Sequence, residues 1–189
     1  MIPATTALRR AALVVVALAG AACASTQGQP ATTTEVRPAP SKFHQEVSYR
    51  IEALLDDEAE VLHGRARMRY ANRSAETLDT LWFHLYLNAF RPNSAWAQRE
   101  LEFGNRRFQD LGPDEWGFQH LTSVTVDGRK VEPVFPGAPD STVVAIPLPT
   151  PIAPGGEIVV DIDFDARPSS LPRRQGRQGR QYDFAHWFP

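Results

Sequence analysis

The sequence predicts an all-β fold, either an antiparallel β-sandwich or a saddle-shaped sheet. Several short segments alternate apolar and polar side chains, which is the period of a strand with one buried face. The chain contains sixteen prolines and twelve glycines, and both residue types suit strands and turns better than long helices. No segment carries a sustained 3.6-residue apolar period, so a fold built on long helices is excluded.

The first strands are expected within residues 47–88. Residues 47–53 and 65–70 alternate, and an acidic, turn-rich link joins them, so they are expected to pair as an antiparallel meander. Residues 77–88 carry bulky side chains on both faces, with Leu81 and Phe83 on one and Trp82 and His84 on the other. Both faces should therefore be covered, which places this third strand in the middle of a sheet beside the first two.

The remaining strands follow a less regular stretch, in which Ser94 is expected to cap a short helix. Strands are predicted at residues 118–126, 130–135, 141–148 and 157–165, with tight turns at Asp127-Gly128 and at residues 154–156. The predicted core combines the inward positions of these strands: Tyr49, Ile51, Met68, Tyr70, Leu81, Phe83, Leu85, Val124, Ile158, Val160, Ile162 and Phe164.

The leader, residues 1–23, is predicted to be a secretory signal peptide. Arg9 and Arg10 precede an apolar run over residues 11–22, which is shorter than the roughly 20 residues that span a bilayer. Cys23 follows small residues, so a lipoprotein signal with lipidation at Cys23 and ordinary cleavage without a lipid both stay open. Either way the protein is expected to be exported, to the periplasm or the cell surface. Residues 24–42 are rich in Thr, Gln, Pro and Ala and are expected to form a disordered tether.

Residues 43–189 carry no recognisable catalytic or metal site. The five histidines, His44, His63, His84, His120 and His186, include no i,i+4 pair and no H-E-x-x-H sequence. No phosphate-binding loop and no nucleophile elbow occurs either. The acidic groups at residues 56–58 and at Asp161, Asp163 and Asp165 are expected to be solvated turns and strand faces. No metal, cofactor or catalytic residue is therefore predicted in this chain.

An arginine-rich segment, residues 168–181, contains Arg173, Arg174, Arg177 and Arg180 without an acid. The favoured interpretation is a solvated, flexible loop, and the alternative is a basic patch that contacts an acidic partner or nucleic acid. No aromatic residue interrupts the arginines, and the net charge of the chain is −2, so no nucleic-acid partner is expected.

Spaced polar and apolar positions carry a resemblance to a known family. They are Tyr49 and Ile51, then Leu62, Gly64, Tyr70, Asn72 and Ser74, then T-L-x-x-L-W-F-H-L-Y-x-N over residues 77–88, and finally A-H-W-F-P over residues 185–189. This pattern resembles the N-terminal domain of the M1 zinc aminopeptidases, and it covers residues 47–189.

The resemblance implies a non-catalytic β-domain of an exported M1-type zinc aminopeptidase, which caps the catalytic domain and walls the substrate cleft. Zinc and the H-E-x-x-H motif would belong to a downstream catalytic domain, so this chain should be a fragment that is inactive alone. The family's first domain also lends a Glu or Gln to the substrate's amino group, and the nearest candidates are Gln178 and Gln181. The alternative is a freestanding cell-surface β-sandwich that binds a protein or a glycan.

Overall fold

The computed structural model describes residues 45–171 and 174–189, all within one compact unit. The expectations for the signal peptide, the tether, Cys23, His44 and Arg173 lie outside the described residues.

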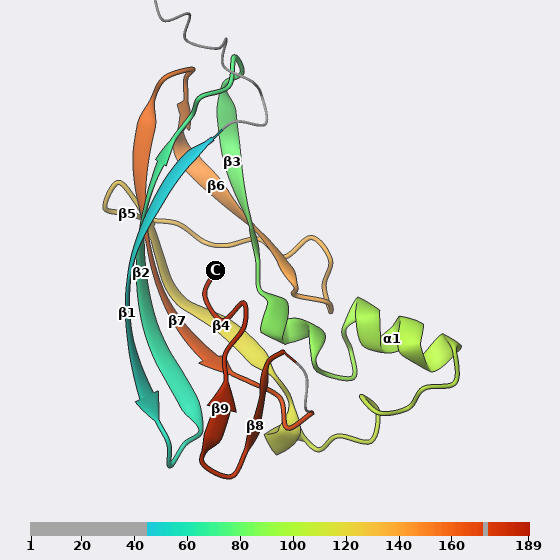
Figure 1. Ribbon diagram of the computed structural model, residues 1–189. Helices are drawn as coiled ribbons and strands as arrows, with labels where there is room; N and C mark the ends of the chain where they lie inside the picture. Colours follow the sequence, from blue (N-terminus) through green and yellow to red (C-terminus); the bar gives the residue numbers. More distant parts are fainter. Residues whose placement is uncertain (1–44, 172–173) are drawn as a thin grey trace, which may run out of the picture. The chain divides into compact units, whose positions relative to one another are not determined.

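Two antiparallel sheets build this unit (Figure 1). The larger sheet has the strand order β1-β2-β7-β4-β5, with bounds β1 (Glu46–Asp56), β2 (Val61–Ala71), β7 (Glu157–Arg167), β4 (Phe118–Val126) and β5 (Arg129–Lys130). The smaller sheet pairs β3 (Leu78–His84) with β6 (Val143–Ile152). A separate hairpin consists of β8 (Gly176–Gln178) and β9 (Gln181–Asp183). The predicted all-β antiparallel class is confirmed.

Three short helices complete the unit: η1 (Tyr86–Ala89), α1 (Ala95–Glu102) and η2 (Pro113–Glu115). Helix α1 begins where the sequence predicted, because the Ser94 hydroxyl accepts a hydrogen bond from the Ala97 amide at 3.0 Å. None of the helices in the described ranges is long and apolar enough to cross a membrane.

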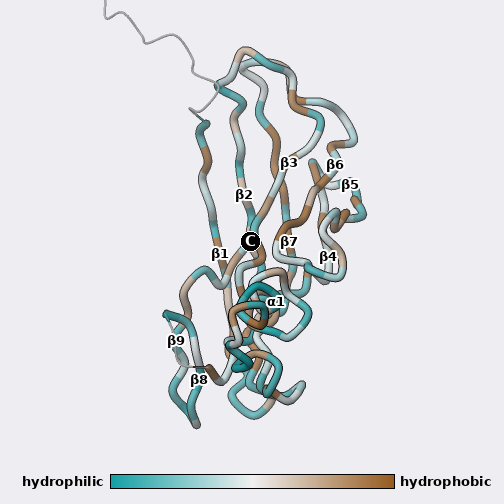
Figure 2. Tube along the Cα trace, turned by 90° about the vertical axis from the view of Figure 1, so that its right-hand side faces the viewer, coloured by the Kyte–Doolittle hydropathy of each residue, from teal (hydrophilic) through white to brown (hydrophobic). Residues whose placement is uncertain are grey.

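The core lies between the two sheets, and alternation along the strands builds it. On β7 the even positions from Ile158 to Phe164 are buried, as predicted, and they meet the buried side chains of β3 and β6. Figure 2 shows hydrophobic positions recurring along the strands of both sheets. The opposite face of β7 carries acids that pair with β2, for example Arg65 Nε with Asp163 Oδ1 at 2.6 Å. Such exposed pairs add about 0–1 kcal/mol each, so the core dominates stability.

The partner predicted for the third strand is wrong. Strand β2 pairs with β7, whereas β3 lies in the second sheet, with Trp82 61% exposed on its outer face. The extended conformation also ends at His84, because the chain turns into η1. Alternation shows which side chains share a face, but it does not show which strand lies alongside. Here β7 supplies the acids that match the arginines of β2.

Two further expectations need correction. Nine of the twelve predicted core residues are buried, but Ile51 and Tyr70 are only partly buried and Tyr49 is exposed. Tyr49 and Ile51 are not fully buried because they lie on β1, which is the edge strand of its sheet. The strand expected at residues 130–135 is also shorter, since β5 ends at Lys130 and Val134 forms an isolated bridge to Ala145 of the smaller sheet.

Two buried asparagines connect the loops to the sheets. Asn72 Nδ2 donates to the carbonyls of Glu76 at 2.7 Å and Ile152 at 3.0 Å, while its Oδ1 accepts from the Ser74 amide at 3.0 Å. Asn88 Nδ2 donates to the Gln119 carbonyl at 3.0 Å, and its Oδ1 accepts from the Gln119 amide at 2.8 Å. Asn72, Ser74 and Asn88 belong to the spaced polar positions quoted above. In this structure they satisfy buried backbone groups.

Candidate functional site

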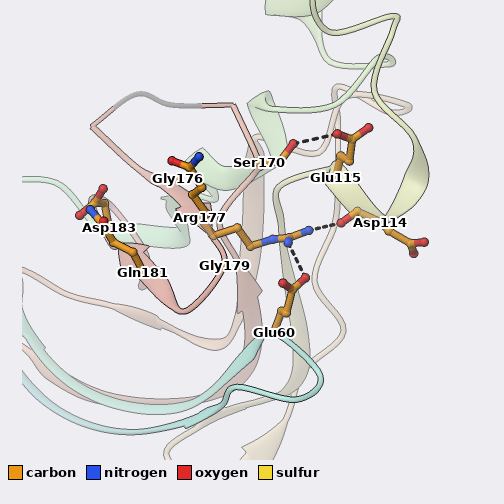
Figure 3. Close-up of a pocket in the computed structure, with 10 residues that line it drawn as sticks. Glu60, Asp114, Glu115, Ser170, Gly176, Arg177, Gly179, Gln181 and Asp183 are labelled. Carbon is orange, nitrogen blue, oxygen red and sulfur yellow. Dashed lines mark hydrogen bonds and ion pairs between the residues drawn. The ribbon is translucent and has the colours of Figure 1, made fainter.

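A cavity of about 600 Å³ lies where the β8–β9 hairpin, the β1–β2 turn and η2 meet (Figure 3). Four acids line it, together with Arg177, Ser170 and both glutamines singled out from the sequence. The acids are Glu60, Asp114, Glu115 and Asp183. Four carboxylates against one guanidinium make this cavity acidic.

Arg177 holds the hairpin in place. Its guanidinium forms an ion pair with Glu60 and donates to the backbone carbonyl of Asp114 (Figure 3). Its Nε also donates to the backbone carbonyl of Pro168 at 3.1 Å. The side chain is only 9% exposed, so Glu60 supplies the counter-charge that such a site requires. Within the hairpin's connection to β7, the Ser169 amide donates to Gln175 Oε1 at 3.0 Å, and both residues are buried.

The prediction of a solvated loop over residues 168–181 is therefore wrong at Arg177 and at the buried residues around it. Arg180 does match the expectation of exposure, with a side chain that is 89% exposed and paired with Asp57, and Arg174 is also exposed. The docking of Arg177 depends on Glu60, which the sequence places far away in the β1–β2 turn. Since Arg177 and Arg180 each pair with an acid, the structure does not favour the alternative of a free basic patch.

Gln178 and Gln181 face each other across the β8–β9 hairpin and both line the cavity. The turn between them includes Gly179 at φ 58°, a conformation that glycine adopts without strain. The structure thus brings both sequence candidates to one acid-lined cavity. Amide and carboxylate oxygens at such a place can accept hydrogen bonds from a cationic group.

The acids of the cavity differ in how they are already used. Glu115 Oε2 accepts from the Gly112 amide at 2.8 Å, and Oε1 accepts from the Ser170 hydroxyl at 3.3 Å. Glu60 is paired with Arg177. The carboxylate of Asp183 has no hydrogen bond or ion pair within the ranges that the structure describes.

Sequence reasoning missed Glu60, Asp114, Glu115 and Asp183 as members of one site. These residues lie in a turn, a 3-10 helix and a short hairpin that are distant in sequence. The one local signal was the surplus of arginines without acids in residues 168–181, which implied distant counter-charges.

A second feature is the aromatic rim, which we define as Tyr49, His84, Tyr86, His186 and Phe188. The Tyr49 and Phe188 ring centroids are 5.6 Å apart, those of His186 and Tyr86 are 4.8 Å apart, and those of Tyr86 and His84 are 4.9 Å apart. Through the first two of these contacts the segment at residues 184–189 touches β1 and η1, and Figure 1 shows its end lying between the two sheets. Tyr49, Tyr86 and Phe188 all remain exposed.

The described histidines have separate surroundings. His63 Nδ1 lies 2.6 Å from Asp165, and His120 stacks on Phe118 at a centroid distance of 4.8 Å. Burial lowers the pKa of His120, Arg91 lowers it further, and Asp165 opposes the shift. Among residues 45–171 and 174–189, no group of three or more His, Cys, Asp or Glu side chains could hold a metal ion.

No protein-family profile matches this sequence, and no curated protein matches it. Similar solved structures include the M1 zinc metallopeptidase from Deinococcus radiodurans, with 16% identity and a TM-score of 0.43. A mutant of that enzyme has 17% identity and a TM-score of 0.43, and the same mutant bound to a Tyr-Ser-Ala substrate has 17% and 0.42. Each alignment covers 71% of this chain and 24% of the other. The chain thus matches about a quarter of the length of these proteins.

Proposed function

We propose that residues 43–189 form the non-catalytic N-terminal β-domain of an exported M1-type zinc aminopeptidase. In that protein the domain caps the catalytic domain and forms one wall of the substrate cleft. The aromatic rim carries the proposal, together with the spaced sequence positions described above. Zinc and the general base would be supplied by the downstream domain, and the zinc there would polarise the scissile carbonyl.

The rim suits a docking surface for several reasons. Exposed aromatic side chains gather at one place, beside the segment that would lead into the next domain. Contiguous exposed apolar surface in a soluble protein commonly marks an interaction site. Ring contacts already order Tyr86 and Phe188, so little conformational entropy is lost when a partner covers them.

We test docking in the longer protein with Tyr86→Ser and with a matched control, Phe103→Ser. Phe103 is also an exposed aromatic residue, but it lies at the end of α1. Tyr86→Ser is expected to lower aminopeptidase activity about tenfold at unchanged zinc content, whereas Phe103→Ser leaves activity intact. The isolated 189-residue chain should bind no stoichiometric zinc and hydrolyse no aminoacyl substrate. Equal activity of the two variants, or hydrolysis by the isolated chain, would contradict the proposal.

The alternative function is a freestanding cell-surface module that binds a protein or a glycan, and exposed Trp82 could serve as a stacking platform. The coding sequence after codon 189 separates the two functions. An open frame that contains H-E-x-x-H supports the peptidase domain. A stop codon at that point would instead favour the binding module.

Within the proposed enzyme, Gln178 and Gln181 would hold the substrate's α-ammonium group at the cleft entrance. A hydrogen bond to a charged group contributes about 1.5–3 kcal/mol. The double substitution Q178A/Q181A in the longer protein should therefore lower kcat/KM about tenfold or more for peptides with a free amino terminus. Gln98→Ala, an exposed glutamine on α1, is the control and should leave kcat/KM unchanged. An unchanged kcat/KM in the double variant would show that neither glutamine binds the substrate's amino group.

We also propose export with a lipid anchor at Cys23, which would hold the protein on a bacterial membrane. A lipidated chain fractionates with membranes, and Cys23→Ser should move it to the soluble exported fraction. Cys23 is the only cysteine of the chain, so no other thiol competes for the modification. Soluble wild-type protein after export would show that ordinary cleavage occurs and that no lipid is attached.

A further inference from the structure

Among the described residues, one long edge of strand β1 has no strand partner. The strand spans 11 residues, Glu46–Asp56, and pairs with β2 along its whole length. β1 is the outermost strand of its sheet, so its other edge has no strand partner among the described residues. Alternate backbone N–H and C=O groups on that edge can form hydrogen bonds with a further strand, and proteins usually cover or block such an edge.

The side chains of β1 also favour a partner. Val47, Tyr49 and Leu55 lie on the core side of the sheet yet remain exposed, and Leu54 on the opposite side is 70% exposed. A neighbouring strand would bring side chains to within about 5 Å of each of these. The edge is therefore unusually apolar for one in contact with water.

The sequence of β1 is complementary to itself in one antiparallel register. With Ile51 opposite Ile51 of a second copy, Arg50 lies opposite Glu52 of that copy, and Glu52 opposite its Arg50. The same register places Val47 beside Leu55 and Tyr49 beside Ala53, each twice by symmetry. Side chains directly opposite in a sheet share a face, so core-side residues meet core-side residues.

The neighbouring registers that keep the faces matched are unfavourable. A shift in one direction places Arg50 opposite Arg50, and a shift in the other places Glu52 opposite Glu52. Like charges directly opposite each other destabilise a strand pair. In the favoured register the acids at the strand ends, Glu46 and Asp56, come together. Each already has a partner, because Arg73 Nη2 lies 2.6 Å from Glu46, and Asp56 Oδ1 accepts from the Ala59 amide at 2.9 Å.

We propose that two copies of this chain associate through β1, in the register centred on Ile51, so that one sheet continues across both copies. The Arg50–Glu52 pair, at 2.8 Å within one chain, then becomes part of a cluster of four alternating charges at the dimer axis. This proposal does not depend on the peptidase assignment, since it concerns the chain by itself.

The test is the molar mass of the full chain in solution, measured by sedimentation equilibrium over a range of concentrations. The wild type should dimerise, whereas Arg50→Glu and Glu52→Arg should each weaken the dimer at least about tenfold, because each places like charges opposite each other twice. An equimolar mixture of the two variants should dimerise again, because its heterodimer restores both opposite-charge pairs. The double exchange R50E/E52R should also dimerise, and far-UV circular dichroism checks that each variant is folded.

The equimolar mixture distinguishes specific strand pairing from nonspecific association, because nonspecific association would not depend on which charges are combined. A wild type that stays monomeric at all concentrations would overturn the proposal. Single variants that dimerise like the wild type would also overturn it, as would a mixture that stays monomeric. If both single variants fail to fold, the double exchange R50E/E52R becomes the test, since it carries both substitutions but keeps the opposite-charge pairs. A folded double variant that stays monomeric would then overturn the proposal.

Discussion

Phe164→Ala is expected to lower the free energy of unfolding by about 3–5 kcal/mol, the range observed for removing a buried phenylalanine. Phe164 is 1% exposed in the middle of β7 and packs over Gly64 of β2. A Cβ atom at Gly64 would lie 2.2 Å from Cζ of this ring, so the ring occupies the space that the glycine leaves open. Chemical denaturation of the variant and the wild type measures the difference. Phe103→Ala, at an exposed position, is the control and should change the free energy of unfolding by less than about 0.5 kcal/mol.

The close contact between the Phe164 ring and Gly64 can be tested more directly with a double-mutant comparison. Gly64→Ala alone should be destabilising by about 1–3 kcal/mol, because the new methyl group collides with the ring. In the Phe164→Ala background the same change should cost little or restore stability, since the methyl group enters the cavity. The two substitutions should therefore be strongly non-additive. Additive effects would mean that the ring does not fill the space beside Gly64.

Asn72→Leu is expected to cost a comparable amount, about 3–5 kcal/mol, although it places an apolar side chain in a buried site. The change leaves the carbonyls of Glu76 and Ile152 and the Ser74 amide without the partner that Asn72 supplies. Each buried polar group without a partner costs about 1–3 kcal/mol. Thermal unfolding should show a clear fall in Tm.

The matched control is Asn93→Leu, the same chemical change at an exposed asparagine before α1. It should shift the free energy of unfolding by no more than about 0.5 kcal/mol. An equal loss of unfolding free energy in both variants would mean that the substitution by leucine itself is destabilising, whatever its position. A small loss at Asn72 alone would show that water replaces its hydrogen bonds.

The sequence by itself determined which residues face inward on most strands. Alternation predicted the buried positions Ile158 to Phe164, and the side-chain chemistry of Ser94 predicted the start of α1. These features depend on groups close together in the chain, so local patterns contain them. Gln178 and Gln181 were candidates only through the family resemblance, and the structure places both at one cavity.

Only the tertiary structure decided which strands are neighbours and which charges meet. Strand β2 pairs with β7, with Arg65 and Asp163 98 residues apart, and Arg177 is docked by Glu60 from the β1–β2 turn. Asn72 and Asn88 likewise satisfy carbonyls of distant segments. The physical reason is that a period of two specifies the face of a strand but not its partner. The partner is set by contacts between side chains that meet only when the whole core has formed.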